Sequence, residues 1–367
     1  MATAAHAAFS PVEITPDWEG FVRTIRRERV PDRVHFIELF IDPEVQEAIA
    51  RRYGLLDGLR RDDPHWDEQF QIRLQRFLGY DYVRATCEGL AMRLKVLNAE
   101  DTSALKRAGG RQYVDEHKGP VTNWDEFEKF DWARVEHITT RQLEYFEKHL
   151  PDDMCVVAFG QIGHYAEMLN WLMGYETLCF ALFNDRELVR AMFERLDHLY
   201  QAAVRTIVQF DRVKVIWGSD DMGFRSGTLI SPADLREFVL PGHKALARIA
   251  HDAGRPYILH SCGKLSPILP DLVDDVRIDG KHSFEDTIGS VIEFKRKYGH
   301  KVAALGGIDV DFLCRSDETA IRRRVRETLA ACQSEGGYCL GSGNSICNYI
   351  PVDHYLAMLD EGRKWRG

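Results

Sequence analysis

The chain has 367 residues, of which 45% are hydrophobic and 29% are charged, and its formal net charge is −9. This balance is typical of a globular protein with a sizeable core and excludes a disordered or fibrous chain. Because the net charge is acidic and no run of 18 apolar residues occurs, we expect neither a nucleic-acid partner nor a membrane segment.

The cysteines and the N-terminal segment indicate the cellular compartment. Eight cysteines are spread through a long chain, which fits reduced thiols better than a disulfide framework. The first residues, MATAAHAAFSPVEITPDW, lack the charged start and the long apolar core of a secretory signal. We therefore expect a cytoplasmic protein.

Residues 1–28 are predicted to form an N-terminal arm, and residues 29–367 a single domain. Within this domain, eight stretches of strand-forming residues are bounded by turn signals. In chain order they are 33–40, 80–85, 155–163, 213–221, 256–263, 276–284, 301–309 and 337–344. Helical patterns lie between most of them, which predicts an α/β fold with a parallel sheet.

Eight such units favour a closed (β/α)8 TIM barrel. An open doubly wound sheet would leave edges and would normally place a glycine-rich phosphate turn early in the chain. Residues 86–151 depart from the alternation of strands and helices. We expect this stretch to be an inserted hairpin and loop segment between strands two and three that partly covers the barrel mouth.

Catalytic groups in such barrels lie at the carboxyl ends of the strands, so polar residues at those points are the candidate site residues. The candidates are Glu38, Gln161, His164, Asp220, Asp221, His260, Cys262, Lys281, His282 and Asn344.

The most specific pattern is His260-Ser261-Cys262, because side chains at positions i and i+2 of an extended segment project to the same side. An imidazole and a thiolate are typical zinc ligands, and the third ligand would be Cys339 or Cys347. The alternative is that no ion binds, with His260 a hydrogen-bonded histidine and Cys262 a buried packing thiol.

Other candidates also have two interpretations. Asp220 and Asp221 bind a cationic group, act as acid and base, or cap the loop that follows them through side-chain hydrogen bonds. Lys281 and His282 are functional groups, or the lysine forms an ion pair with Glu285. Glu38 is an inward-facing polar group at the barrel top or the partner of a buried arginine, because an unpaired buried carboxylate is costly.

Three segments resemble the superfamily of uroporphyrinogen decarboxylase-like barrels, which also includes cobalamin-dependent methyltransferases. They are RPYILHSCGKLSPILPDLVDDVRIDGKHSFED, KVAALGGIDVDFL and GGYCLGSGNSICNYIPVDHYLAML. The resemblance extends from about Arg29 to the end of the chain, and it implies a barrel that often pairs into a homodimer.

The resemblance implies different chemistry for the two branches. Decarboxylases carry an arginine-rich motif, R-Q-A-G-R, where this chain has a strand containing Glu38, followed by Asp42, and a histidine where it has Asn344. The methyltransferases bind zinc through H-x-C, matched here by His260 and Cys262, and through a distant cysteine. That cysteine resembles the Asn344 position, which lies five residues after Cys339 and three before Cys347.

The resemblance therefore favours an enzyme that moves a methyl group between a corrinoid (cobalamin) carrier protein and a small acceptor or donor, with zinc as cofactor. In this interpretation Asp220, His282 and Gln161 are catalytic, and Glu38, His164, Asp221, Lys281 and Asn344 bind substrate. Two alternatives are a metal-free decarboxylase or lyase for a small carboxylated substrate, and a corrinoid- or tetrapyrrole-binding protein without turnover.

Overall fold

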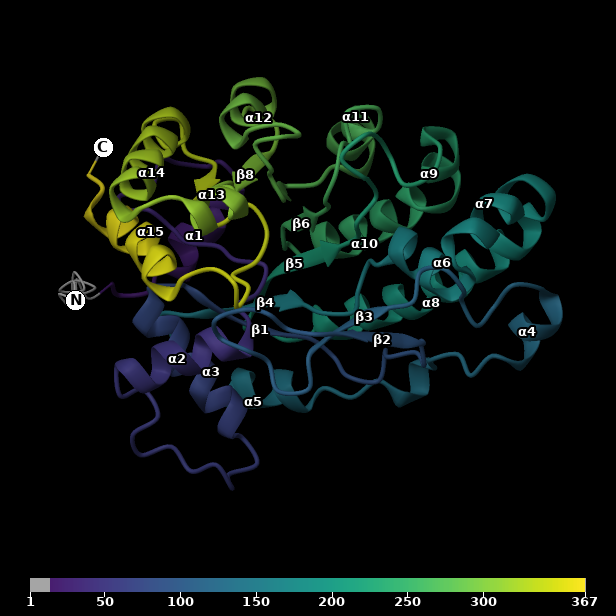
Figure 1. Ribbon diagram of the computed structural model, residues 1–367, viewed down its shortest axis with the longest axis horizontal. Helices are drawn as coiled ribbons and strands as arrows, with labels where there is room; N and C mark the ends of the chain where they lie inside the picture. The colour runs from purple at the N-terminus through teal and green to yellow at the C-terminus, as the bar shows by residue number, and fades with distance from the viewer. Residues whose placement is uncertain (1–13, 367) are drawn as a thin grey trace.

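The computed structural model describes residues 14–366 and contains a curled parallel sheet surrounded by helices (Figure 1). Its seven strands follow the order β1-β4-β5-β6-β7-β8-β9, so each pairs with the next one of the sheet along the chain. They are β1 (Tyr82–Ala85), β4 (Cys155–Phe159), β5 (Val213–Ser219), β6 (Tyr257–His260), β7 (Gly280–His282), β8 (Ala303–Leu305) and β9 (Tyr338–Cys339).

Helices connect and cover these strands. They are α1 (Trp18–Ile25), α2 (Pro43–Arg52), α3 (Trp66–Leu78), α4 (Trp124–Lys129), η1 (Val135–His137), α5 (Arg141–His149), α6 (Tyr165–Met173), α7 (Tyr175–Asn184), α8 (Arg186–Ile207), α9 (Pro232–Phe238), α10 (Leu240–Asp252), α11 (Leu269–Asp271), η2 (Leu272–Val276), α12 (Val291–Tyr298), α13 (Val310–Arg315), α14 (Glu318–Cys332) and α15 (Val352–Lys364).

The expected first strand, 33–40, is not a regular strand. Phe36 and Ile41 form isolated parallel bridges to Leu340 and Ile346, beyond β9. On its other side, Tyr82 and Arg84 of β1 donate side-chain hydrogen bonds to the backbone carbonyls of residues 38 and 39. The segment therefore lies between the first and last strands of the sheet, an arrangement consistent with a TIM-like barrel.

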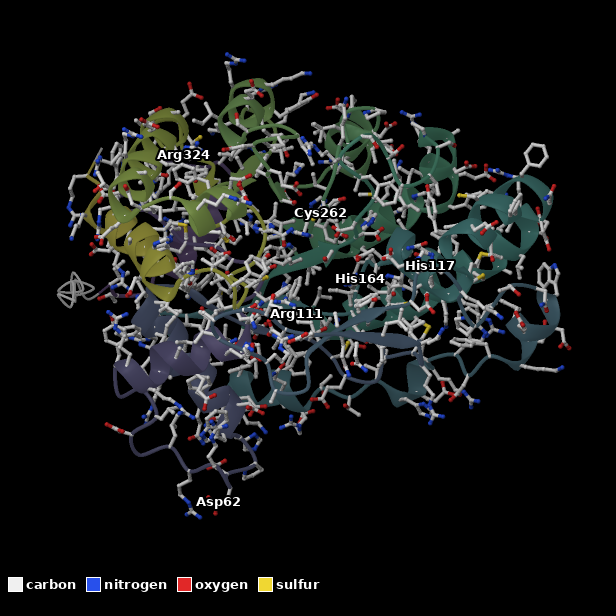
Figure 2. All side chains as sticks on the ribbon, in the orientation of Figure 1. Asp62, Arg111, His117, His164, Cys262 and Arg324 are labelled. Carbon is white, nitrogen blue, oxygen red and sulfur yellow. The ribbon has the colours of Figure 1, made fainter. Side chains whose placement is uncertain are left out.

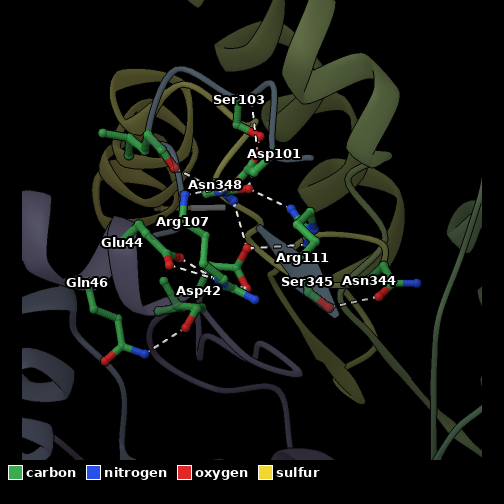
Figure 3. Close-up of polar contacts among 12 residues, drawn as sticks. Asp42, Glu44, Gln46, Asp101, Ser103, Arg107, Arg111, Asn344, Ser345 and Asn348 are labelled. Atoms are coloured by element: carbon green, nitrogen blue, oxygen red, sulfur yellow. Dashed lines mark hydrogen bonds and ion pairs between the residues drawn. The ribbon is translucent and has the colours of Figure 1, made fainter. Parts of the chain in front are cut away.

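The stretch between β1 and β4 contains an antiparallel ribbon of β2 (Val96–Ala99) and β3 (Arg111–Val114). The loop joining the two strands is fastened to the chain after β9, because Asp101 accepts a hydrogen bond from Asn348 (Figure 3). Arg107 in the same loop pairs with Glu44 and with Asp42 at the start of α2. These contacts hold the excursion to loops at the carboxyl ends of the strands.

The N-terminal segment is packed where the structure describes it. Residues 1–13 of the expected arm lie outside the described residues. Helix α1 buries Phe21 and Ile25 completely, and Phe21 stacks on Tyr82 of β1. Residues 18–25 therefore belong to the core of the barrel and are not a separate arm.

The helices of the described residues do not span a membrane. Within residues 14–366, every helix is too short or too polar to cross a lipid bilayer.

Glu38 joins the bridged segment to the loop after β9. Its two carboxyl oxygens lie 2.6 Å from the backbone nitrogen and from the hydroxyl of Ser342. Burial raises the pKa of Glu38 to about 8, although the hydrogen bonds from Ser342 and the charge of Arg84 lower it. The carboxyl group is therefore a buried polar group held by Ser342, and the described residues form no ion pair between Glu38 and an arginine.

We expect the stability of the protein to depend on pH through Glu38. A pKa raised in the folded state means that the folded protein holds this proton more tightly, so stability is highest below pH 4.5 and falls as the pH rises toward 8. Glu38→Gln, which keeps the volume without the charge, should unfold at a higher urea concentration than wild type above pH 8.

At pH 5 the two proteins should unfold at similar urea concentrations, because the wild-type carboxyl group is then largely protonated. Glu38→Ala is the control, since it leaves the Ser342 donors without a partner and should destabilise at both pH values by about 1–3 kcal/mol. A Gln variant that follows the wild-type pH dependence would contradict the role of this carboxyl group.

Candidate functional site

A group of three potential metal ligands lies at the carboxyl ends of β5 and β6. The ligand atoms of Asp221, His260 and Cys262 all lie within 4.8 Å of one another. The Nε2 atom of His260 is 3.4 Å from Cys262 Sγ and 3.4 Å from Asp221 Oδ1. Figure 2 shows Cys262 near the centre of the molecule, away from its ends.

Strand alternation explains why these side chains converge. His260 ends β6 and pairs in register with Ser219 of β5 and His282 of β7. Two residues beyond Ser219 and His260 come Asp221 and Cys262, which project to the same side as their strands' last residues. The carboxylate also accepts a hydrogen bond of 2.8 Å from the backbone nitrogen of Cys262, which ties the two strand ends together.

The chain must turn directly after Cys262, and Gly263 makes this possible. Its φ is +85°, and a Cβ atom at this position would lie 2.2 Å from the backbone of Gly223. Any other residue would be strained and would clash with that loop. The glycine therefore fixes the direction in which the strand end leaves the sheet.

Two further donors converge on the sulfur of Cys262. The Nδ2 atom of Asn344 lies 3.1 Å from Sγ, and the hydroxyl of Ser283 lies 3.4 Å from it. Ser283 has a φ of +83°, a conformation that a side-chain-bearing residue rarely adopts and that is concentrated at functional sites. The donors suit a sulfur that carries negative charge.

The electrostatics of the group are those of a charged pair formed by His260 and Asp221. Burial lowers the pKa of His260, but the neighbouring sulfur of Cys262 and the carboxylate of Asp221 outweigh it and raise this pKa to about 10. Burial raises the pKa of Asp221, but its hydrogen bond and charge interaction with His260 lower it to about 2. His260 is therefore mainly protonated at neutral pH, and its charge faces the carboxylate of Asp221.

His282 contacts His260 from within the barrel. Their Nδ1 atoms are 2.8 Å apart, and both side chains are buried. Burial, together with the charges of His260 and Lys281, lowers the pKa of His282 well below its ordinary value. A neutral His282 accepts the Nδ1 proton of His260, which leaves His260 Nε2 directed at Cys262 and Asp221.

Asp220 caps the amino end of helix α6. Its two oxygens accept hydrogen bonds from the backbone nitrogens of Ala166 and Glu167, at 2.9 and 3.0 Å, in the first turn of α6. His243 of α10 contacts the same carboxylate at 3.0 Å. Because Asp220 precedes Asp221, it points to the helix side of the sheet, and it is completely buried there.

The remaining candidates are placed separately. Gln161 is exposed in the loop after β4. His164 contacts Glu167 at 2.8 Å, and although burial lowers its pKa, that carboxylate raises it above the ordinary value. Lys281 is buried beside helix α12, where its Nζ lies 5.9 Å from the ring centre of Phe294. No Lys281–Glu285 ion pair forms among the described residues.

The cysteines expected as the third metal ligand lie outside this group. Cys339 and Cys347 are not members of the ligand group, whose third member is Asp221. Cys339 is the last residue of the two-residue strand β9 and is fully buried, and burial raises the pKa of its thiol well above the ordinary value. Cys347 lies in the loop after β9, where burial raises the pKa of its thiol although the nearby Arg111 lowers it. Ser283 was missed because nothing in its sequence context signals a positive φ.

The fold and this group of ligands define a class, the TIM-like barrels with a potential metal centre at the carboxyl ends of the strands. The profile of the family described as uroporphyrinogen decarboxylase (URO-D) matches residues 120–365. The chain belongs to this family.

Two curated relatives are methyltransferases by name. A "Methylated-thiol--coenzyme M methyltransferase" of Methanosarcina mazei is 26% identical over 171 residues, 45% of this chain and 44% of the relative. A "Methylcobamide:CoM methyltransferase MtaA" of Methanosarcina barkeri is 24% identical over 208 residues, 54% of this chain and 58% of the relative. The chain thus matches about half the length of these relatives.

A solved structure, described as a "methyltransferase from Methanosarcina mazei", resembles the whole chain. Its TM-score is 0.64 at 18% sequence identity, and the match covers 94% of this chain and 97% of that one. This likeness supports the fold.

We expect Asp220→Ala to be strongly destabilising. The change leaves His243 and two backbone nitrogens without their buried acceptor, which should cost about 3–5 kcal/mol of unfolding free energy in a denaturant titration. Asp317→Ala is the matched control, because Asp317 caps α14 from an exposed position and should cost about 1 kcal/mol. Equal losses in the two variants would contradict the buried capping role.

Proposed function

We propose that the protein is a methyltransferase that moves a methyl group between the corrinoid (cobalamin) of a carrier protein and a small acceptor or donor. The observation that carries this proposal is the convergence of Asp221, His260 and Cys262 at the strand ends. The names of the two curated relatives support it. A homodimer also remains part of the proposal.

The three side chains fit a zinc ion. They offer one nitrogen, one sulfur and one oxygen, each a donor type that zinc accepts, and three protein ligands leave a fourth position open. Bound zinc would lower the pKa of a thiol or water in that position. Asp221 is therefore proposed as a metal ligand, in place of the cysteine expected from the sequence.

The residues around these ligands would orient them. Asn344 and Ser283 donate toward Cys262 Sγ and restrict the direction in which its charge is presented. His282 accepts the Nδ1 proton of His260 and so selects Nε2 as the ligand atom. We assign His282 this positioning role, rather than proton transfer, because it is fully buried.

The substrate would bind in the neighbouring opening. A cavity of about 580 Å³ lies against the loops after β7, β8 and β9 and is lined by Asn344, whose amide contacts Cys262. Phe284, Phe312 and Tyr349 give it apolar walls. A small molecule held there would be next to the sulfur, as transfer of a methyl group requires.

The ligand set is tested by metal analysis of untagged protein purified without added zinc. We expect about one zinc per chain in wild type and roughly 100-fold weaker binding in Cys262→Ser and Asp221→Asn. Cys347→Ser is the control and should retain zinc. Loss of zinc in this variant, or well under one equivalent in wild type, would refute the proposed ligands.

The reaction is tested with methylcobalamin and a small thiol, by following the loss of the methylcobalamin spectrum. Wild type should demethylate the cofactor, and Cys262→Ser should lose most of this activity while still folding. Tight binding of cobalamin without turnover would instead favour a binding protein, and release of carbon dioxide from a small carboxylate would favour a lyase.

The role of His282 predicts a difference between two variants. His282→Phe removes the acceptor for His260 Nδ1 and should weaken zinc binding by about 10- to 100-fold, whereas His282→Asn, which keeps an acceptor oxygen, should lose less. Nitrogen-15 NMR of the histidines supplies an independent readout, because wild-type His282 should carry its proton on Nε2. A proton on Nδ1 of His282 would contradict the assignment.

A further inference from the structure

A second cavity, of about 260 Å³, lies between the end of β7 and helix α12. It is bounded by the loop after β6, the end of β7 and helix α12, and Leu269, Ile288 and Phe294 supply apolar walls. Nothing in the proposed methyl transfer uses this space.

Lys281 lines this cavity. The side chains of β7 alternate, so His282 points to His260 inside the barrel, whereas Lys281 points outward toward α12. Lys281 is only 8% exposed, and its Nζ lies 4.3 Å from the ring centre of Phe284.

This amine forms no ion pair with a carboxylate of the described residues. Its Nζ donates to the backbone oxygens of Ser283 at 2.5 Å and His282 at 3.4 Å, and no carboxylate oxygen lies within 4.0 Å. Burial lowers the pKa of Lys281 to about 8, although neighbouring negative charges raise it, so the amine is still mainly charged near pH 6.5. A buried cation without a counter-ion is costly unless an anion joins it.

We infer that this cavity is a binding site for a small carboxylate with an apolar chain or ring, whose anionic end meets Lys281. The apolar body would pack between Leu269, Ile288 and Phe294. The carboxylate would give the ammonium the charged partner that the protein itself does not supply.

The remaining charges at the cavity favour a monoanion. Lys264 and Lys297 line it together with Glu285 and Glu293. The charges of these four side chains cancel, and the positive charge of Lys281 remains. A dianion such as phosphate would leave excess negative charge beside two carboxylates, which repel it. A single carboxylate group matches the one positive charge that remains after the other four cancel.

Ser283 connects this cavity to the ligand group. Its backbone oxygen accepts from Lys281, and its hydroxyl lies 3.4 Å from Cys262 Sγ. An anion that draws Lys281 away from Ser283 therefore acts on a residue that also touches the sulfur. The binding site itself requires neither zinc nor a methyl donor. Binding of a carboxylate can therefore be tested independently of the proposed reaction.

Hexanoate is a suitable probe, measured by isothermal titration calorimetry on the full chain at pH 6.5. We expect saturable binding that Lys281→Met weakens by about 10- to 100-fold, the effect of losing one charge-assisted hydrogen bond. Hexanamide, which lacks the charge, should bind more weakly by a similar factor. Ile288→Trp, which fills the apolar part and keeps the amine, should also weaken binding.

Lys295→Met is the matched control. Lys295 is as buried as Lys281, but it donates to the backbone oxygen of Gly336 and does not line the cavity. This variant should bind hexanoate like wild type. Absence of saturable binding, equal binding by the Lys281→Met and wild-type proteins, or tighter binding of inorganic phosphate than of hexanoate would overturn the inference.

Discussion

The parallel register of β5, β6 and β7 is the constraint on which the site depends. Ser219, His260 and His282 are paired partners across these strands, so their side chains lie at one level and on one side of the sheet. This row brings the two imidazoles together and directs the next inward residues, Asp221 and Cys262, toward each other. A shift of one residue in any strand would send its side chain to the helix layer.

The same alternation shows which parts of the site could be predicted from the sequence. The pair His260 and Cys262 could be identified because their spacing alone places them on one side of an extended segment. Asp220 and Asp221 could not be assigned without knowing where β5 ends, because adjacent residues face opposite layers. With Ser219 known to face inward, Asp221 joins the ligands and Asp220 caps a helix.

The fold was predictable for similar reasons, and its exceptions have physical causes. Seven of the eight expected stretches contain strands of the parallel sheet, because apolar runs bounded by turns specify buried strands. The stretch 33–40 is bridged on one side only and is held to β1 by side chains. The third member of the ligand group could not be chosen from the sequence, because spacing along the chain does not show that Asp221 comes within 4.8 Å of His260 and Cys262.

The end of β7 carries two buried polar side chains, Lys281 and His282, that point in opposite directions. His282 faces the barrel interior as a neutral group, whereas Lys281 faces α12 as a cation. Burial lowers the pKa of both side chains. Ser283 follows both residues in a strained conformation and contacts Lys281 through its carbonyl and Cys262 through its hydroxyl. Strain of about 1–3 kcal/mol persists only where surrounding contacts enforce it, and the contacts of Ser283 with Lys281 and Cys262 supply such a constraint.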